Sequence, residues 1–255
     1  MIPKIRIVDV HKDASGKDRF VDSSGKARQF INLNDEYAII ENSSNIDVKL
    51  DGWYLRDAAG HKFRFPKGFV LKKNSRVTIH TGTGANTTTH LYWGHKMHMW
   101  NNEGDVAILF ARMKTTGYCS GEFYDKPKHS NDKSLRHYKC NLKSHKSYPT
   151  HYYCYCTYNL NKHAAGVVNG KEVPAHPKYN ITASGTSCKH GTLAADTRIF
   201  PFGTKLEIPV YGKGTVEDVG KAIKKMCIDL WFPSHQKALE WGVEELTVEI
   251  HRLVV

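Results

Sequence analysis

The stretch from Glu217 to Phe232, EDVGKAIKKMCIDLWF, governs how the C-terminal half of the chain is interpreted. Its last residues have the apolar and β-branched composition of a strand. Strand alternation places Ile228 and Leu230 on one face, and Asp229 on the other face together with Trp231. A carboxyl group beside an indole, facing a groove rather than bulk solvent, is expected to have a raised pKa, as a general acid requires. Asp229 is therefore a candidate general acid.

The same carboxylate has a second interpretation. Lys221, Lys224 and Lys225 precede it closely, and a strand carboxylate is often paired with a neighbouring lysine. The residues of this stretch alone do not decide between the two.

Composition sets wide limits. The chain has 255 residues, enough for one large domain or two ordinary ones, and a formal net charge of +12. Such a charge suits an anionic polymer as partner, although an ordinary soluble basic surface explains it equally well. The sequence has no long apolar run, so no membrane span is expected. The first residues also lack the apolar core of a secretion signal, so we expect another export route or a signal outside this sequence.

The cysteines allow both thiol and metal chemistry. There are six, and their pairing cannot be read from the sequence. Cys154-x-Cys156 and Cys188-x-His190 could ligate zinc, but neither has the spacing common in structural zinc sites. Free thiols or disulfides are preferred, and neither a metal nor another cofactor is expected.

Short strands separated by turn residues dominate the chain, which predicts a mostly β protein. In the N-terminal part we expect strands at Tyr37 to Asn42, Val77 to Gly82 and Asp105 to Phe110. Residues 114–150 lose this pattern, are rich in Lys and Arg, and are predicted to be a basic linker. Strands return from residue 152 onward. One helix is expected near Ser234 to Trp241, ending at Gly242.

The segment Asn32 to Phe110 resembles a lamin-tail domain. The resemblance is carried by NDEY at 34–37, LDGWYLRD at 50–57, Phe65-Pro66, and WNNEGD at 100–105. It implies an immunoglobulin-like β-sandwich over residues 1–113 that serves as an attachment module. Within it, Trp53 and Leu55 should face the core. His90, His95 and His98 could approach one ion, but ordinary surface histidines are the preferred interpretation.

The C-terminal part resembles the three-aspartate (3D) domain of cell-wall lytic enzymes, including membrane-bound lytic transglycosylase A. The resemblance is carried by CTYNL at 156–160 and by residues 193–250, which contain ADTRIFPFGT, EDVGKAIK, CIDLWF and FPSHQKALEWG in order. It implies a six-stranded double-psi β-barrel over residues 151–255.

The resemblance also assigns the site. The three aspartates fall on Asp196, Asp218 and Asp229. Asp229 is implied to be the catalytic acid/base, and the other two are implied to be supporting carboxylates. Thr157 and Tyr158 are placed on the family's T-x-Y floor, where they would touch sugar. The family usually has two glycines after the second aspartate, whereas Lys221 follows Gly220 here, so a lysine could crowd the site or hold an anionic substrate.

Three further residues are candidates for binding sugar or transferring a proton. Trp231 shares the face of Asp229 and is a possible sugar platform, with a packing role equally open. Trp241 lies at helical spacing from Ala238 and is expected in the core. His235, at the start of the helix, is expected on the surface.

The implied activity is cleavage of β-1,4 bonds in peptidoglycan at the cell wall or outside the cell. Asp229 would protonate the leaving oxygen, and in a lytic transglycosylase the same carboxylate would then deprotonate the sugar's 6-hydroxyl. A hydrolase would need a positioned water, with Asp218 about 6.5–9.5 Å away as base, and a separation of about 5–5.5 Å would suit a covalent nucleophile. The alternative from another class is an expansin-like module that binds polysaccharide without cutting it. Nucleic-acid processing is disfavoured, because no carboxylate cluster for metals and no P-loop is found.

Overall fold

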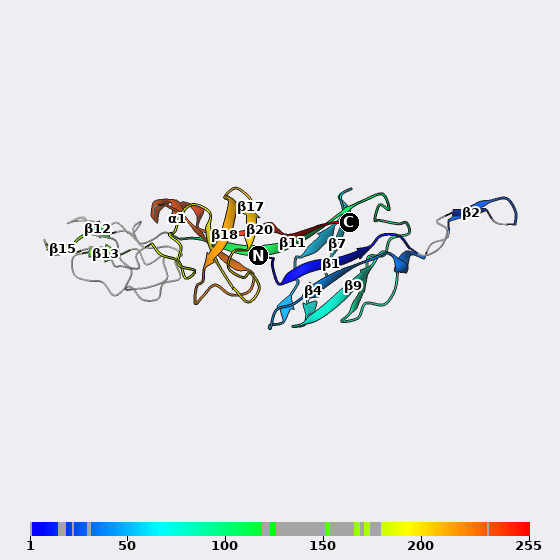
Figure 1. The fold of residues 1–255 in the computed structure, drawn as a ribbon, viewed down its shortest axis with the longest axis horizontal. Helices are drawn as coiled ribbons and strands as arrows, with labels where there is room; N and C mark the ends of the chain where they lie inside the picture. The colour runs from blue at the N-terminus through cyan, green and yellow to red at the C-terminus, as the bar shows by residue number, and fades with distance from the viewer. Residues whose placement is uncertain are drawn as a thin grey trace. The chain divides into compact units, whose positions relative to one another are not determined.

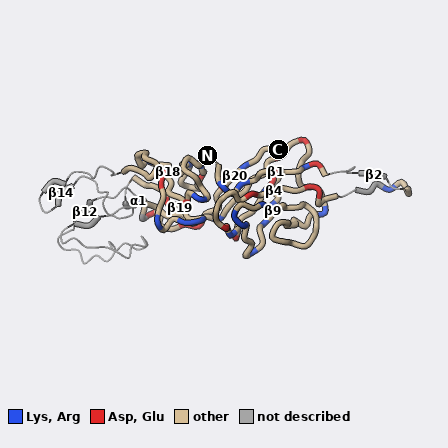
Figure 2. Tube along the Cα trace, turned by 60° about the horizontal axis from the view of Figure 1, so that its bottom comes forward, with Lys and Arg blue, Asp and Glu red and all other residues tan. Residues whose placement is uncertain are grey.

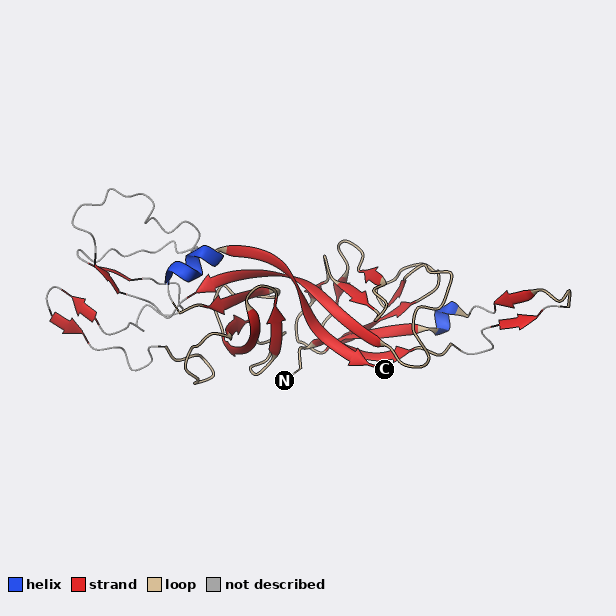
Figure 3. Ribbon diagram, turned by 90° about the horizontal axis from the view of Figure 1, so that it is seen from above, coloured by secondary structure: helices blue, strands red, loops and turns tan. Residues whose placement is uncertain are grey.

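The computed structural model describes residues 2–14, 19–21, 23–29, 32–118, 123–125, 151–153, 166–168, 171–173, 180–233 and 235–255. The described chain is mostly β, with one short α-helix and one 3-10 turn (Figures 1 and 3). No helix among these residues is long and apolar enough to cross a membrane. Most of the expected linker lies outside the described residues, and the predicted domain boundaries stay a prediction.

The chain divides into two compact units, which are described separately. The N-terminal unit consists of Ile2–Arg112, Arg198–Pro201 and Thr247–Val255, and the C-terminal unit holds Met113–Thr197 and Phe202–Leu246. Two long strands contribute residues to both units, namely β11 (Val106–Tyr118) and β20 (Val243–Val254).

Two main sheets build the N-terminal unit. One has the order β1-β4-β9-β10, and in the other β11 pairs with β6 and β6 with β7. Two small pairs, β2 with β3 and β5 with β8, complete the described strands. The elements are β1 (Ile5–His11), β2 (Arg19–Val21), β3 (Ala27–Gln29), the 3-10 turn η1 (Leu33–Asp35), β4 (Tyr37–Asn42), β5 (Val48–Lys49), β6 (Tyr54–Arg56), β7 (Lys62–Arg64), β8 (Val70–Leu71), β9 (Ser75–His80) and β10 (His90–Tyr92).

The core of this unit follows strand alternation. Trp53 and Leu55 are fully buried while Tyr54 and Arg56 are half-exposed, as predicted. The expected strand at Tyr37 to Asn42 is β4, with every second residue buried. A turn at Gly52 has a positive φ of 76°, which glycine adopts without steric cost. These features are consistent with the expected immunoglobulin-like sandwich.

In the C-terminal unit the strand order is β17-β18-β16-β19-β11, with β20 beside β11. The β11–β19 and β16–β18 pairs are parallel, whereas β16–β19 and β17–β18 are antiparallel. This path is open within the described residues, so a closed double-psi barrel is not established. The remaining elements are β12 (Phe123–Asp125), β13 (His151–Tyr153), β14 (Gly166–Val168), β15 (Lys171–Val173), β16 (Thr192–Ala195), β17 (Lys205–Ile208), β18 (Gly212–Asp218), β19 (Cys227–Trp231) and α1 (His235–Trp241).

The helix α1 packs closely on strand β11. A Cβ atom added at Gly117 would meet the carbonyl oxygen of Ala238 at 2.5 Å, so only glycine permits this approach. The helix ends before Gly242, whose φ is 62°, which confirms the predicted stop. Trp241 is half-buried, and its indole Nε1 donates a hydrogen bond to Thr115 Oγ1 at 3.2 Å.

Candidate active site

Strand β19 presents Asp229 as the alternation predicts. Ile228 and Leu230 are fully buried, whereas Asp229 and Trp231 are half-buried on the opposite face. Two neighbours flank Asp229 in register, Thr116 on β11 and Ala194 on β16. The Thr116 hydroxyl donates a hydrogen bond to Asp229 Oδ1.

Asp218 belongs to the same row of residues, which runs in register across four neighbouring strands: Thr116, Asp229, Ala194 and Asp218. Its partner across the β16–β18 pair is Ala194, so Asp218 and Asp229 stand on the two strands that flank β16. The register shifts at this point and leaves Glu217 as the extra residue of a β-bulge. Bulges re-aim side chains and are common near active sites. With strands about 4.8 Å apart, the Cα atoms of the two aspartates are roughly 10 Å apart.

The carboxylates of Asp218 and Asp196 are buried and accept hydrogen bonds from backbone amides. Asp218 Oδ1 accepts hydrogen bonds from the amides of Ala183 at 2.9 Å and Val219 at 3.0 Å. Asp196 directly follows β16 and accepts from the amide of Lys225 at 2.9 Å. The ends of the parallel strands β16 and β18 therefore bring the two carboxylates to one edge of the sheet, where they hold the loops around Asp229.

Tyr118 is a residue that the sequence interpretation missed. It lies two positions after Thr116 on β11 and is in register with Trp231, so it shares the face of Asp229. The residue is 4 % exposed, and its hydroxyl has no hydrogen-bond partner in the described part of the chain. Burial raises the pKa of Tyr118 well above its usual range, and Asp218, Cys188 and Asp229 add to the rise. The phenol is thus a protonated donor close to both aspartates.

A signal for this residue was present in the sequence. Thr116-Gly117-Tyr118 has the T-x-Y spacing of the family's floor motif, whereas Thr157 and Tyr158 are adjacent residues. Thr157 and Tyr158 lie outside the described residues and stay predictions. The basic, strandless appearance of residues 114–150 concealed the strand that continues to Tyr118.

The remaining residues predicted to bind substrate, protons or metal differ in how far they are exposed. Lys221 is exposed in the loop between β18 and β19. Trp231 is half-buried, and its role as a sugar platform stays a prediction. His235 begins α1, and its side chain lies outside the described residues. Cys227 is a free thiol, Cys188 is half-buried, and the other four cysteines lie outside the described residues.

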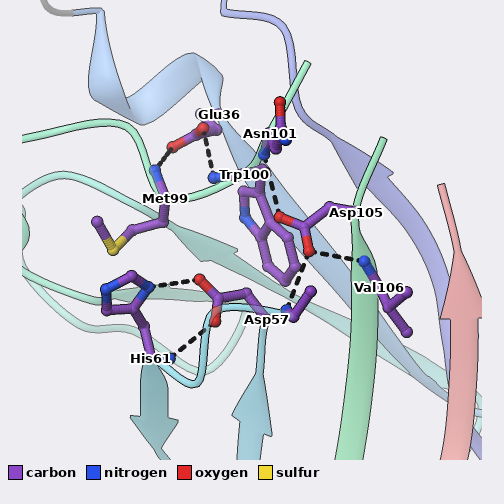
Figure 4. Close-up of polar contacts among 9 residues, drawn as sticks. Glu36, Asp57, His61, Met99, Trp100, Asn101, Asp105 and Val106 are labelled. Atoms are coloured by element: carbon purple, nitrogen blue, oxygen red, sulfur yellow. Dashed lines mark hydrogen bonds and ion pairs between the residues drawn. The ribbon is translucent and has the colours of Figure 1, made fainter. Parts of the chain in front are cut away.

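The N-terminal unit has buried carboxylates of a different kind. Glu36 accepts the amides of Met99 at 3.0 Å and Trp100 at 2.9 Å, and Asp57 accepts both the amide and Nδ1 of His61 (Figure 4). Each of these carboxylates ties a loop to the sheets. Glu36 of the NDEY motif and Asp57 of the LDGWYLRD motif therefore have structural roles.

The histidines considered as ion ligands have separate surroundings. His90 Nδ1 contacts His80 Nε2 at 2.9 Å, whereas His95 packs edge-on against Trp93. His98 Nδ1 lies 3.6 Å from Glu36 Oε1. Within the described ranges no group of three or more His, Cys, Asp or Glu is placed to hold a metal.

Two family models match different parts of the chain. Residues 2–120 match the Lamin Tail Domain model, and residues 191–254 match the 3D domain model. The chain combines a lamin tail domain with a 3D domain. The aspartates Asp196, Asp218 and Asp229 all fall inside the 3D domain, while Thr116 and Tyr118 precede its matched residues.

Two curated proteins of Bacillus subtilis (strain 168) are similar to part of the chain. "Cell wall-binding protein YocH" is 34% identical over 74 residues, which cover 28% of this chain and 26% of that protein. "Putative cell wall shaping protein YabE" is 33% identical over 73 residues, which cover 27% of this chain and 18% of that protein. The matches thus span a minor part of each relative.

Proposed function

We propose that this protein acts on the cell wall and cleaves β-1,4 glycosidic bonds of peptidoglycan, with Asp229 as general acid/base. The proposal rests on one arrangement: Asp229 is half-buried, bonded to the Thr116 hydroxyl, and faces the same side as the partnerless Tyr118 hydroxyl. The 3D domain and the cell-wall names of the two relatives support the choice of substrate. In the same proposal, the C-terminal unit closes as a double-psi β-barrel.

The chemistry needs one proton donor at the glycosidic oxygen. Protonated Asp229 gives its proton to the leaving oxygen, and the bond to the anomeric carbon breaks through an oxocarbenium-like state. The resulting carboxylate then takes the proton of the sugar's 6-hydroxyl, whose oxygen closes a 1,6-anhydro ring. Thr116 orients the carboxyl group, and the buried Tyr118 phenol stabilises the Asp229 carboxylate once its proton has left.

The arrangement of the aspartates favours a single acid/base. Asp218 is two strands from Asp229, and its Oδ1 already accepts two backbone amides. A covalent nucleophile would stand about 5–5.5 Å from the acid. Because Asp218 Oδ1 is already engaged by backbone amides, the arrangement supports a lytic transglycosylase, or a hydrolase with a water between the carboxylates, over a double-displacement glycosidase.

A second candidate function is binding without cleavage. It is favoured by the name of one relative, a cell wall-binding protein. In this alternative the row around Asp229 would hold sugar hydroxyls, and the lamin tail domain would add a second attachment point. In either case the lamin tail domain serves as the module that localises the protein at the wall.

The deciding experiment compares the wild type with Asp229→Asn on purified peptidoglycan. Soluble anhydro-muropeptides, identified by mass spectrometry, should appear with the wild type and disappear with the variant, while both proteins sediment with the wall. Glu207→Gln is the matched control, because Glu207 is an exposed carboxylate on β17 of the same unit. Wild-type protein that sediments with every wall preparation and releases nothing would establish the binding function instead. Reducing sugar without anhydro ends would establish hydrolysis.

A further inference from the structure

The loop between β18 and β19 connects two of the candidate aspartates. Residues 219–226, here called the lysine loop, start directly after Asp218 and end three positions before Asp229. The loop carries Lys221, Lys224 and Lys225, all exposed, and no acidic residue. Basic residues are marked along both units in Figure 2.

The backbone of the lysine loop is fixed. The amide of Ile223 donates to the carbonyl of Gly220 at 3.1 Å, and Ile223 is 9 % exposed, so its side chain anchors the loop. A Cβ atom at Gly220 would lie 2.5 Å from the Ile223 side chain, which explains glycine at this position. Lys225 has a φ of 55°, and its amide is held by Asp196. The lysines therefore project from a preorganised support.

The charge of this loop is not balanced locally. In the described part of the chain, no ion pair forms to Lys221, Lys224 or Lys225. Instead, the nearby carboxylates Asp196 and Asp218 accept backbone amides. Lysine ammonium groups on flexible stems act as point charges for phosphate and carboxylate groups. Lys224 Nζ contacts the carbonyl oxygen of Gly220 at 3.5 Å, which does not neutralise its charge. A cluster of like charges without ion-pair partners attracts an anionic ligand from outside.

We propose that the lysine loop binds anionic groups of the wall polymer, carboxylate or phosphate, next to the candidate acid. The inference rests on the proposed function, since it places a charged substrate at the same site. It selects glycan strands that carry negative charge over neutral polysaccharide. The loop then sets which part of the wall reaches Asp229.

The test measures sedimentation of the full chain with three wall preparations: intact wall, wall stripped of phosphate polymers by acid, and stripped wall with its carboxylates amidated. The charge-removing variant is Lys221→Gln, Lys224→Gln and Lys225→Gln combined. Its matched control combines Lys189→Gln, Lys205→Gln and Lys213→Gln, three exposed lysines of the same unit. The loop variant should bind intact wall about tenfold more weakly, since each exposed charge contributes modestly. The control variant should bind like the wild type.

The three wall preparations distinguish phosphate from carboxylate as the anionic group that is bound. Loss of wild-type binding on acid stripping identifies phosphate, and loss only on amidation identifies carboxylate. Equal binding to all three preparations, or equal weakening by the control variant, would overturn the proposal. The combined Lys→Arg variant of the loop should bind normally, which excludes misfolding as the cause.

Two outcomes separate this inference from the proposed function. Lysine-dependent binding without any released glycan would support the lysine loop and refute the cleavage. Released glycan whose yield and binding do not change in the loop variant would refute the lysine loop alone. Tighter loop-dependent binding to double-stranded DNA than to intact wall would also overturn the assignment to wall polymers.

Discussion

Thr116 Oγ1 donates a hydrogen bond to Asp229 Oδ1 from the neighbouring parallel strand. The bond orients the carboxyl group that we propose as the proton donor. Thr116→Val keeps the β-branched shape and removes the donor, and should lower kcat about 10- to 100-fold while KM changes little. Thr116→Ser should restore most of the rate. Steady-state kinetics on soluble glycan chains measures both, and an altered KM with unchanged kcat would reassign Thr116 to substrate binding.

Removing the Tyr118 hydroxyl is predicted to lower activity without lowering stability. A buried hydroxyl without a partner costs free energy, so Tyr118→Phe should leave the free energy of unfolding unchanged or raise it by up to about 1 kcal/mol. Product release should nevertheless fall about tenfold or more, because the Asp229 carboxylate loses the buried phenol that stabilises it. Thermal unfolding and product assays on the same preparation test the two effects. Unchanged product release would make Tyr118 a packing residue.

Local patterns in the sequence predicted much of the fold. Alternation located β4 and the buried faces of β6 and β19, and glycine marked the end of α1. The aspartates were found through ordered motifs, and the structure places Asp218 and Asp229 in one row. What the sequence could not show is register, since the pairing of Ala194 with both aspartates depends on strands distant in the chain. The bulge at Glu217 is likewise a property of the pair.

The length of strand β11 was also not predicted from the sequence. The pattern from Asp105 onward predicted a strand ending at Phe110, but β11 continues to Tyr118. Lys114 and Thr116 are polar residues that would ordinarily indicate the start of a linker. Pairing with β19 overrides that local preference, since strand propensity depends strongly on tertiary context. The two site residues on β11 were missed for this reason.

Asp196 is predicted to act through the lysine loop rather than on substrate. Asp196→Ala leaves the amide of Lys225 without its acceptor, at a cost of about 1–3 kcal/mol. Hydrogen exchange should therefore quicken in residues 219–226, whereas peptides from β17 should be unaffected. Asp229→Ala is the comparison, because it removes a carboxylate that is bonded to a side chain and should not quicken exchange in the loop. Equal exchange in the Asp196 variant and the wild type would contradict the anchoring role.

Asp105 should be among the most sensitive positions of the lamin tail domain. Its carboxylate accepts the amides of Ala58, Asn101 and Val106 at 3.0, 3.0 and 2.6 Å, and the residue is 7 % exposed. Asp105→Ala leaves these donors without their acceptor and should destabilise the N-terminal unit by about 3 kcal/mol or more. Asp9→Ala, at an exposed position on β1, is the control. Hydrogen-exchange protection of the β4 and β9 amides, followed at increasing urea concentration, measures the difference in stability. A similar loss of stability in both variants would contradict the prediction.

His251 makes the stability of the N-terminal unit depend on pH. Burial, followed by the charge of Arg6, lowers the pKa of His251, although Glu249 opposes the effect. In the unfolded chain the imidazole therefore takes up a proton at about pH 6.5, whereas the native unit resists this protonation. The contribution to stability is fully present above that pH, and falls as the pH drops until the lower native pKa is passed. The slope cannot exceed about 1.4 kcal/mol per pH unit for one proton, and partial exposure reduces it further.

The test of this linkage uses His251→Gln, which cannot be protonated in this range. Between about pH 7.5 and about pH 5, which spans the histidine transition, the wild type should lose stability relative to the variant. Opening free energies from hydrogen exchange in β4 and β9, corrected for the intrinsic pH dependence, give the comparison within one unit. His90→Gln is the control, because it replaces an exposed histidine of the same unit, on β10. Parallel curves for the wild type and His251→Gln would show that protonation of the half-buried imidazole is not linked to unfolding.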